Sequence, residues 1–193
     1  MKLKAMQKAL KKFDEVELYA RALARIDTIN AERKRYQKKV LEEHFGDNIL
    51  PILALYLVLK EDGREDAYAL SEKVANEMYG VGRKRMEFLG RFPFFYWIIE
   101  KFTPNLMQKM FPEEGWDIEW VEVSEKQVAF NMHGCFYHQT LNDYNAPELT
   151  PVFCGLDDLI YDNVSPYLRW ERKGTLGRGD HHCDFRFINP KYE

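Results

Sequence analysis

The chain has 193 residues, 46% of them hydrophobic and 31% charged, a composition typical of a globular protein with a sizeable core. Its formal net charge of −3 argues against nucleic-acid binding, for which a basic domain is expected. The start lacks an apolar leader, so we expect a cytoplasmic protein. The longest apolar runs, 49–59 and 92–99, are too short to span a bilayer, and we expect both to form buried helices.

The first 112 residues or so have a helical pattern. Leu3, Met6, Leu10 and Phe13 form one apolar stripe at helical spacing. A charged stretch then runs to Gly46, which is predicted to cap a helix, and a second helix begins at 47 or 48 and ends within 61–66. A third covers 67–79 and stops at the glycines of 80–82. The apolar segment 83–111, interrupted by two prolines, predicts two or three short helices.

The pattern changes to strands after Pro112. Residues 117–123 and 127–135 indicate a hairpin, 136–145 a short helix or loop, 147–164 a helix, and 166–174 and 181–189 two strands around a Gly-rich turn. The predicted fold class is α+β, with N-terminal helices packed on a small C-terminal antiparallel sheet of ββ-α-ββ order. We expect a helical region over 1–112 and a ligand-enclosing region over 113–193, or one compact domain over 1–193.

Strand alternation sorts the side chains of the last predicted strand. His181, Cys183, Phe185 and Phe187 share one face, and the two Phe mark it as the core side; His182, Asp184 and Arg186 share the other. In the preceding strand Arg172 shares a face with Leu168 and Trp170. An inward Arg is costly unless it meets an anion, so Arg172 is either a salt-bridge partner or the receptor of a ligand carboxylate.

The three cysteines are widely spaced and odd in number, which favours reduced thiols over a disulfide framework. Zinc sites favour closely paired Cys and His ligands, and this chain has neither C-x-x-C nor H-x-x-x-H. The adjacent His181 and His182 point to opposite faces of a regular strand and cannot share one metal. We therefore expect no metal and no cofactor.

Three segments carry a family likeness: GCFYH (134–138), PELTPVFCGLDD (147–158) and RKGTLGRGDHHCDFRF (172–187). Together they resemble the L-2-amino-thiazoline-4-carboxylic acid hydrolase family over residues 117–188. The shared pattern is a Cys and an aromatic at a strand end, Cys-x-x-Asp on a helix, then Arg, Thr, a Gly-rich turn and Cys-Asp-Phe. These elements fall on Cys135, Cys154 with Asp157, Arg172, Thr175, Gly179, and Cys183 with Asp184. The layout is also similar to the 4-vinyl-reductase-type ligand-binding fold.

The resemblance implies hydrolysis of a cyclic isothiourea carboxylate to an N-carbamoyl-cysteine, a reaction of cysteine metabolism. It needs a carboxylate receptor, an activated nucleophile and an acid for the leaving group. The expected substrate-binding residues are Arg172, Thr175 and Cys154. The expected catalytic residues are Cys135 or Cys183 as nucleophile and Asp157 or Asp184 as general base, with His133, His138 or His181 as acid. Asp184 could instead support the Gly-rich turn.

Two other functions stay open. A sensor or carrier without catalytic activity would use the aromatic-rich segment 92–111 to line an apolar cavity, and a metal-binding protein is a third alternative. The expected partners are a small-molecule substrate and, as a further expectation, a second copy in a homodimer; nucleic acid and a membrane span are not expected.

Overall fold

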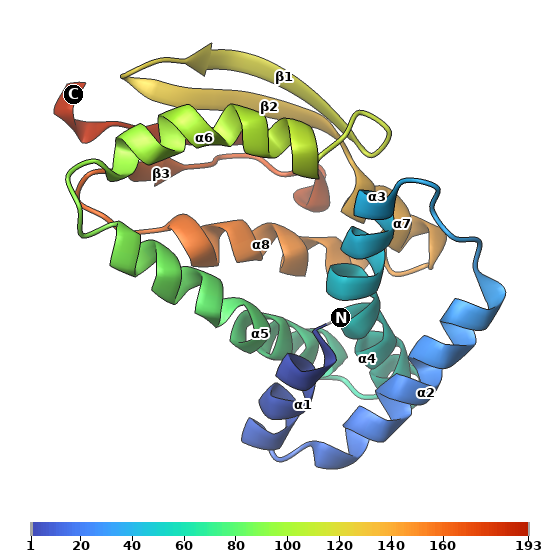
Figure 1. The fold of residues 1–193 in the computed structure, drawn as a ribbon. Coiled ribbons are helices and arrows are strands. Elements are labelled where there is room, and N and C mark those ends of the chain that lie inside the picture. The colour runs from blue at the N-terminus through green and yellow to red at the C-terminus, as the bar shows by residue number, and fades with distance from the viewer. Residues whose placement is uncertain (1, 193) are drawn as a thin grey trace. The chain divides into compact units, whose positions relative to one another are not determined.

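The computed structural model describes residues 2–192 and divides into two compact units, Met1–Tyr79 and Gly80–Glu193. Helices make up the first unit, and a small antiparallel sheet lies in the second (Figure 1), which confirms the α+β class. Within the described range, no helix combines the length and the apolar character needed to cross a membrane.

The first unit is built from α1 (Leu3–Lys12), α2 (Val16–Glu32), α3 (Lys39–Glu43), α4 (Leu50–Glu61) and the beginning of α5 (Ala67–Leu89). Helix α4 is buried around almost its whole circumference and has Pro51 in its first turn. This confirms the buried helix predicted for 49–59, since a helix that is apolar all round must be enclosed. Helix α1 buries Met6 and Leu10 of the predicted stripe.

Two predicted helix ends were wrong. Gly46 lies inside a π-helical segment, His44–Ile49, that joins α3 to α4. Helix α5 continues through Gly80 and Gly82 to Leu89. A glycine in a helix costs only about 1 kcal/mol, which packing can offset. Beyond Gly82, the Arg83 guanidinium donates to the backbone oxygens of Leu159 (2.9 Å) and Asp162 (3.3 Å), so this part of α5 is held in the second unit.

The sheet has the strand order β1-β2-β4-β3, with every neighbouring pair antiparallel. Its strands are β1 (Trp116–Val123), β2 (Gln127–Cys135), β3 (Arg169–Glu171) and β4 (Cys183–Ile188). Helices α7 (Phe136–Asp143) and α8 (Thr150–Tyr161) lie in the chain between β2 and β3. The predicted hairpin and the ββ-α-ββ order are confirmed, although β3 is shorter than predicted because only three of its residues pair with β4.

Aromatic side chains fill the inner face of the sheet. Phe130 on β2 stacks on Phe185 on β4 with ring centroids 4.7 Å apart. Tyr161 of α8 packs edge-on against Phe187, at 5.0 Å, and against Trp170 of β3. Residues 183, 185 and 187 are buried while their neighbours are less so, which confirms the predicted alternation. Helix α8 therefore covers this face (Figure 1).

Helix α6 (Phe95–Met110) runs without a break through Pro104 and contacts β2. The prediction that the run 92–99 is wholly buried was wrong. Phe95 and Tyr96 are buried, whereas Phe94 and Trp97 are 52% and 53% exposed. A helix presents only one stripe to the sheet, so an apolar run that continues around the helix necessarily places part of itself outside.

Candidate functional site: a thiol and carboxylate cluster on helix α8

Helix α8 carries Cys154, Asp157 and Asp158 three and four positions apart, so the three side chains share one side of the helix. Two segments that follow in the chain meet this side. One is the end of β3 with Arg172, and the other is the 3-10 turn Leu176–Arg178. The candidate site is formed where these three elements come together.

Arg172 joins the strand end to the helix by an ion-pair network. Its side chain is 2% exposed. Nη1 donates to Asp157 Oδ2 at 2.9 Å, and Nη2 donates to Asp158 Oδ2 at 2.7 Å and to the backbone oxygen of Cys154 at 2.6 Å. Trp170 Nε1 donates to the second oxygen of Asp158 at 2.9 Å. Of the two alternatives for Arg172, the structure shows the salt bridge.

Asp157 is one of the two carboxyl groups of this cluster. Desolvation by the surrounding protein raises the pKa of Asp157 to about 6, against the opposing effect of Arg172. Asp158 contributes to the same rise. The Asp157 side chain nevertheless keeps 38% of its surface exposed, so solvent reaches it. A carboxyl group with a pKa close to neutrality can exchange protons with a substrate under ordinary conditions.

Cys154 has the environment of a thiolate. A hydrogen bond from the Cys183 thiol lowers the pKa of Cys154 to about 7, with further lowering by the charge of Arg172 and the hydroxyl of Thr175, while desolvation and the charge of Asp157 oppose them. Cys183 is buried, and donating a hydrogen bond to Cys154 raises its own pKa well above the usual range, so Cys183 is the protonated partner of the pair. The backbone N–H of Leu176 donates to the Cys183 sulfur at 3.2 Å and opposes this rise in part.

Cys135 lies at the end of β2, where it caps α7. Desolvation raises the pKa of Cys135 to about 11, although the backbone N–H groups of Tyr137 and His138 lower it in part. The negative charge of Cys154 also contributes to this rise, so the two sulfur atoms are close enough to interact electrostatically. At neutral pH Cys135 is consequently a thiol.

Thr175 supplies a hydroxyl whose hydrogen bonding is incomplete. The residue is 2% exposed, and within residues 2–192 its Oγ1 has no hydrogen-bond partner of normal geometry. Its influence on the pKa of Cys154 shows that the hydroxyl lies near that sulfur. A buried polar group without a partner is costly, so this hydroxyl is available to a ligand or to the thiolate.

Glycine at position 177 allows the turn to close on helix α8. A Cβ at Gly177 would lie 2.9 Å from Cys154 Sγ, 2.9 Å from Thr150 Cγ2 and 3.2 Å from the backbone nitrogen of Pro151. Sequence analysis missed the close approach of Gly177 to helix α8, and it did not include Asp158 among the expected site residues. The only sequence signal for Asp158 was its position next to Asp157.

Asp184 lies on the opposite face of β4 from Cys183. Its Oδ1 accepts hydrogen bonds from the backbone N–H groups of Lys173 (2.9 Å) and Gly174 (2.7 Å). This arrangement supports the turn, the alternative noted for Asp184. His133 pairs with Glu119 at 3.0 Å on the outer face, and His181 is exposed. The Nδ1 of His138 is 3.5 Å from the hydroxyl of Thr150.

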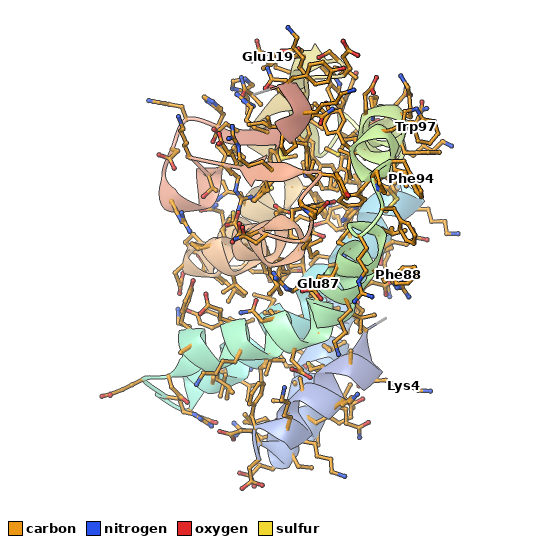
Figure 2. All side chains as sticks on the ribbon, turned by 90° about the vertical axis from the view of Figure 1, so that its left-hand side faces the viewer. Lys4, Glu87, Phe88, Phe94, Trp97 and Glu119 are labelled. Carbon is orange, nitrogen blue, oxygen red and sulfur yellow. The ribbon has the colours of Figure 1, made fainter. Side chains whose placement is uncertain are left out.

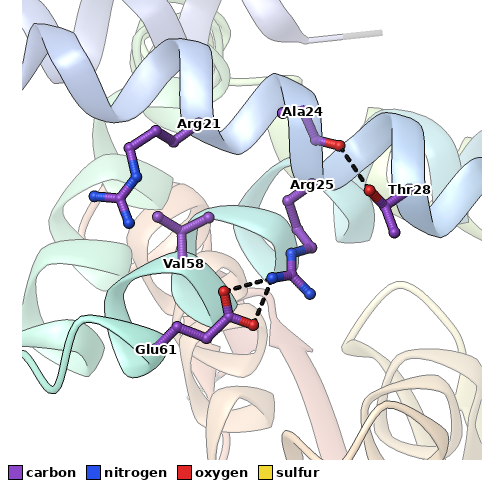
Figure 3. Close-up of a pocket in the computed structure, with 6 residues that line it drawn as sticks. All are labelled: Arg21, Ala24, Arg25, Thr28, Val58 and Glu61. Carbon is purple, nitrogen blue, oxygen red and sulfur yellow. Dashed lines mark hydrogen bonds and ion pairs between the residues drawn. The ribbon is translucent and has the colours of Figure 1, made fainter.

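Two hollows lie elsewhere in the chain. One, of about 350 Å³ in the first unit, is lined by charges that are already paired, since Arg25 binds Glu61 (Figure 3) and Arg21 binds Asp62. The other, of about 400 Å³ between α6 and β1, includes Trp116 and Trp120 in its wall. Neither contains a cysteine, and residues 2–192 contain no group of three His, Cys, Asp or Glu side chains suited to a metal ion.

The fold and the site define an α+β protein with a thiol and carboxylate cluster enclosed between a helix and a small sheet. The model of the L-2-amino-thiazoline-4-carboxylic acid hydrolase family matches residues 42–187, well over half of the chain. The chain belongs to this family, which confirms the resemblance seen in its motifs. No curated protein and no solved structure matches the chain.

Proposed function

We propose that the protein is a hydrolase that opens a small cyclic amidine or thiazoline carboxylate, in a reaction of the type that converts L-2-amino-thiazoline-4-carboxylate to N-carbamoyl-cysteine. Membership of the family supports this reaction class. The observation that carries it is the environment of Cys154, whose thiol is ionised near neutrality beside a carboxyl group that titrates in the same range. A lowered thiol pKa and a nearby proton donor are what nucleophilic catalysis requires.

In the proposed reaction the Cys154 thiolate adds to the ring carbon that lies between nitrogen and sulfur. The bond from this carbon to the ring sulfur then breaks, and the protonated carboxyl of Asp157 supplies the proton to the leaving sulfur. The intermediate is an isothiourea on Cys154. Water adds to the same carbon with Asp157 as base, the bond to Cys154 breaks, and the carbamoyl product leaves. The net change is the addition of one water.

This assignment differs from the sequence-based prediction, which gave the nucleophile role to Cys135 or Cys183 and substrate binding to Cys154. The pKa order favours Cys154, because Cys135 is a thiol at neutral pH and Cys183 stays protonated as the hydrogen-bond donor to Cys154. Thr175 keeps its predicted role in the proposal, since its hydroxyl has no other partner among the described residues.

The substrate carboxylate needs a cation. Both terminal nitrogens of Arg172 already bind acceptors, so we assign Arg172 to orienting Asp157 and lowering the pKa of Cys154. Arg178 directly follows the glycine that contacts Cys154, its side chain is exposed, and no described acid pairs with it. We propose Arg178 as the carboxylate receptor, by bidentate pairing.

The direct test follows substrate loss and product mass during incubation with L-2-amino-thiazoline-4-carboxylate. We expect a product heavier than the substrate by one water, no turnover in Cys154→Ala or Cys154→Ser, and turnover in the matched Cys135→Ala variant. Asp157→Asn should lower kcat, and Arg178→Ala should raise KM with a smaller change in kcat. Full turnover in Cys154→Ala would refute the nucleophile assignment, and an inactive parent protein would refute the reaction.

The alternative of an apolar carrier has less support. It relied on the aromatic segment 92–111 as the lining of a cavity. Of the aromatic residues in this segment, Phe111 lines the hollow between α6 and β1, whereas Phe94, Trp97 and Phe102 are each more than half exposed. Those three side chains do not enclose a guest.

A further inference from the structure

Large apolar side chains are exposed together at the end of α5, in the turn that follows, and on the outer side of α6. We call this the aromatic face; its residues are Phe88, Phe92, Phe94, Trp97, Phe102 and Leu106, each between 37% and 58% exposed. Figure 2 shows Phe88, Phe94 and Trp97 along one side of the molecule, pointing outward. Scattered single apolar residues need no explanation, but a continuous group of this kind marks an interaction surface.

The aromatic side chains form two groups of contacting rings. Phe92 stacks on Phe94 with ring centroids 5.3 Å apart and contacts Phe88 edge-on at 5.8 Å. Trp97 contacts Phe102 at 6.3 Å. On α6, Trp97, Phe102 and Leu106 are exposed, whereas Tyr96 and Met107 are buried, and Phe94 is exposed at the N-cap of the helix. The rings therefore pack on one another and not into the core.

The segment that carries this face is positively charged. Residues 81–111 contain six Lys or Arg and two Glu, a net charge of +4 within a chain of net charge −3. Both glutamates are paired, Glu87 with Arg83 and Glu100 with Lys101. The cations of this segment that have no ion-pair partner among residues 2–192 are Lys84, Arg85, Arg91 and Lys109, and all four are exposed. Lys84 is one helical turn before Phe88, and Lys109 follows Leu106 by three residues, so both border the aromatic face.

We propose that the aromatic face docks onto the surface of an anionic lipid bilayer. Exposed Trp, Phe and Leu flanked by Lys and Arg are the side chains that insert at the headgroup boundary while their cations contact anionic lipid. The long lysine stems can lie along the apolar surface with their charges among the headgroups.

The charges argue against a second copy of the chain, or another protein, as the occupant of the aromatic face. A second copy placed face to face would bring two surfaces of net charge +4 together, and like charges facing each other destabilise an interface. Protein–protein interfaces are also depleted in lysine, whereas this face has exposed lysines at its border. An anionic bilayer complements both the apolar and the cationic side chains.

The test is co-sedimentation of the full chain with vesicles of phosphatidylcholine alone and of phosphatidylcholine with an equal amount of phosphatidylserine. We expect binding to the anionic vesicles that weakens with added salt, and little binding to the neutral ones. The double variant Lys84→Glu and Lys109→Glu should lower the partition coefficient about tenfold or more. Its matched control, Lys8→Glu with Lys11→Glu on α1, changes the charge equally at exposed positions outside the segment that carries the aromatic face, and should bind more tightly than the double variant.

The apolar part is tested separately with Trp97→Ser, whose side chain is exposed, so the fold should persist and binding should fall about tenfold. Val121→Ser, at a 53% exposed position on β1, is the control and should bind as the parent does. No sedimentation of the parent with anionic vesicles, or equal binding by Trp97→Ser, would overturn the proposal. A concentration-dependent dimer in analytical ultracentrifugation that Trp97→Ser converts to monomer would assign the face to a second copy instead.

Discussion

Removing the thiol of Cys183 should change the acidity of Cys154, because the hydrogen bond from Cys183 is the largest influence that lowers the pKa of Cys154 to about 7. In Cys183→Ala this donor is lost. Desolvation and the charge of Asp157, which raise the pKa of Cys154, then outweigh the lowering by Arg172 and Thr175, so this pKa should rise to its ordinary value of 9.0 or above.

The size of the effect follows from the thiolate fraction. At pH 7 a thiol of pKa 7 is about half ionised, and one of pKa 9 about one per cent ionised. Thiolate nucleophilicity rises with pKa, by about six- to tenfold over two units, so it offsets part of this loss. Alkylation of Cys154 at pH 7 should therefore slow at least about fivefold in Cys183→Ala, while its plateau rate at high pH increases.

The assay is pulsed alkylation with iodoacetamide across about pH 5 to pH 9, with peptide mass spectrometry to assign the modified cysteine. In the parent protein the rate at Cys154 should have its midpoint near pH 7. Cys135, with its pKa of about 11, should react on the order of a hundredfold more slowly at pH 7. Cys183→Ser is the matched control, because its hydroxyl keeps a donor and should hold the midpoint closer to 7. An unchanged midpoint in Cys183→Ala, or faster alkylation of Cys135, would refute the reasoning.

Three further predictions concern stability. Gly177→Ala should lower the free energy of unfolding by about 1–3 kcal/mol in urea titrations, because the new Cβ would meet Cys154 Sγ at 2.9 Å. Its control is Gly155→Ala on α8, which has open space around the new Cβ and should be neutral or stabilising. Arg172→Met should lower the free energy of unfolding by about 2–3 kcal/mol, because it removes the ion-pair partner of two carboxylates that are only 38% and 40% exposed. It should also raise the pH midpoint for alkylation of Cys154. A stability equal to the parent's would contradict the ion-pair network. Hydrogen bonds from Arg33 lower the pKa of Glu42 from 4.5 to about 2. This pair therefore stabilises the fold above about pH 4.5, and its contribution, at most about 3 kcal/mol, is lost as the pH falls through 2. Glu42→Gln should make the free energy of unfolding less dependent on pH in this acidic range, and an unchanged pH dependence would count against the pair.

The sequence by itself determined the features that depend on local periodicity. The uniform apolar character of 49–59 predicted the buried helix α4, and alternation in 183–187 predicted that Cys183 points inward. Both follow from backbone geometry that repeats every 3.6 or 2 residues, so they can be derived without knowing what the element packs against. The motif order also sufficed to recognise the family.

Only the tertiary structure decided where helix α5 ends, which side of α6 is exposed and which thiol is acidic. Glycines at 80 and 82 are weak breakers, and contacts beyond them extend the helix. The acidity of Cys154 depends on Arg172 and Cys183, which lie 18 and 29 positions further along the chain. A pKa reflects charges, hydrogen bonds and desolvation through space, and spacing along the chain does not encode these until the helix and the sheet bring the groups together.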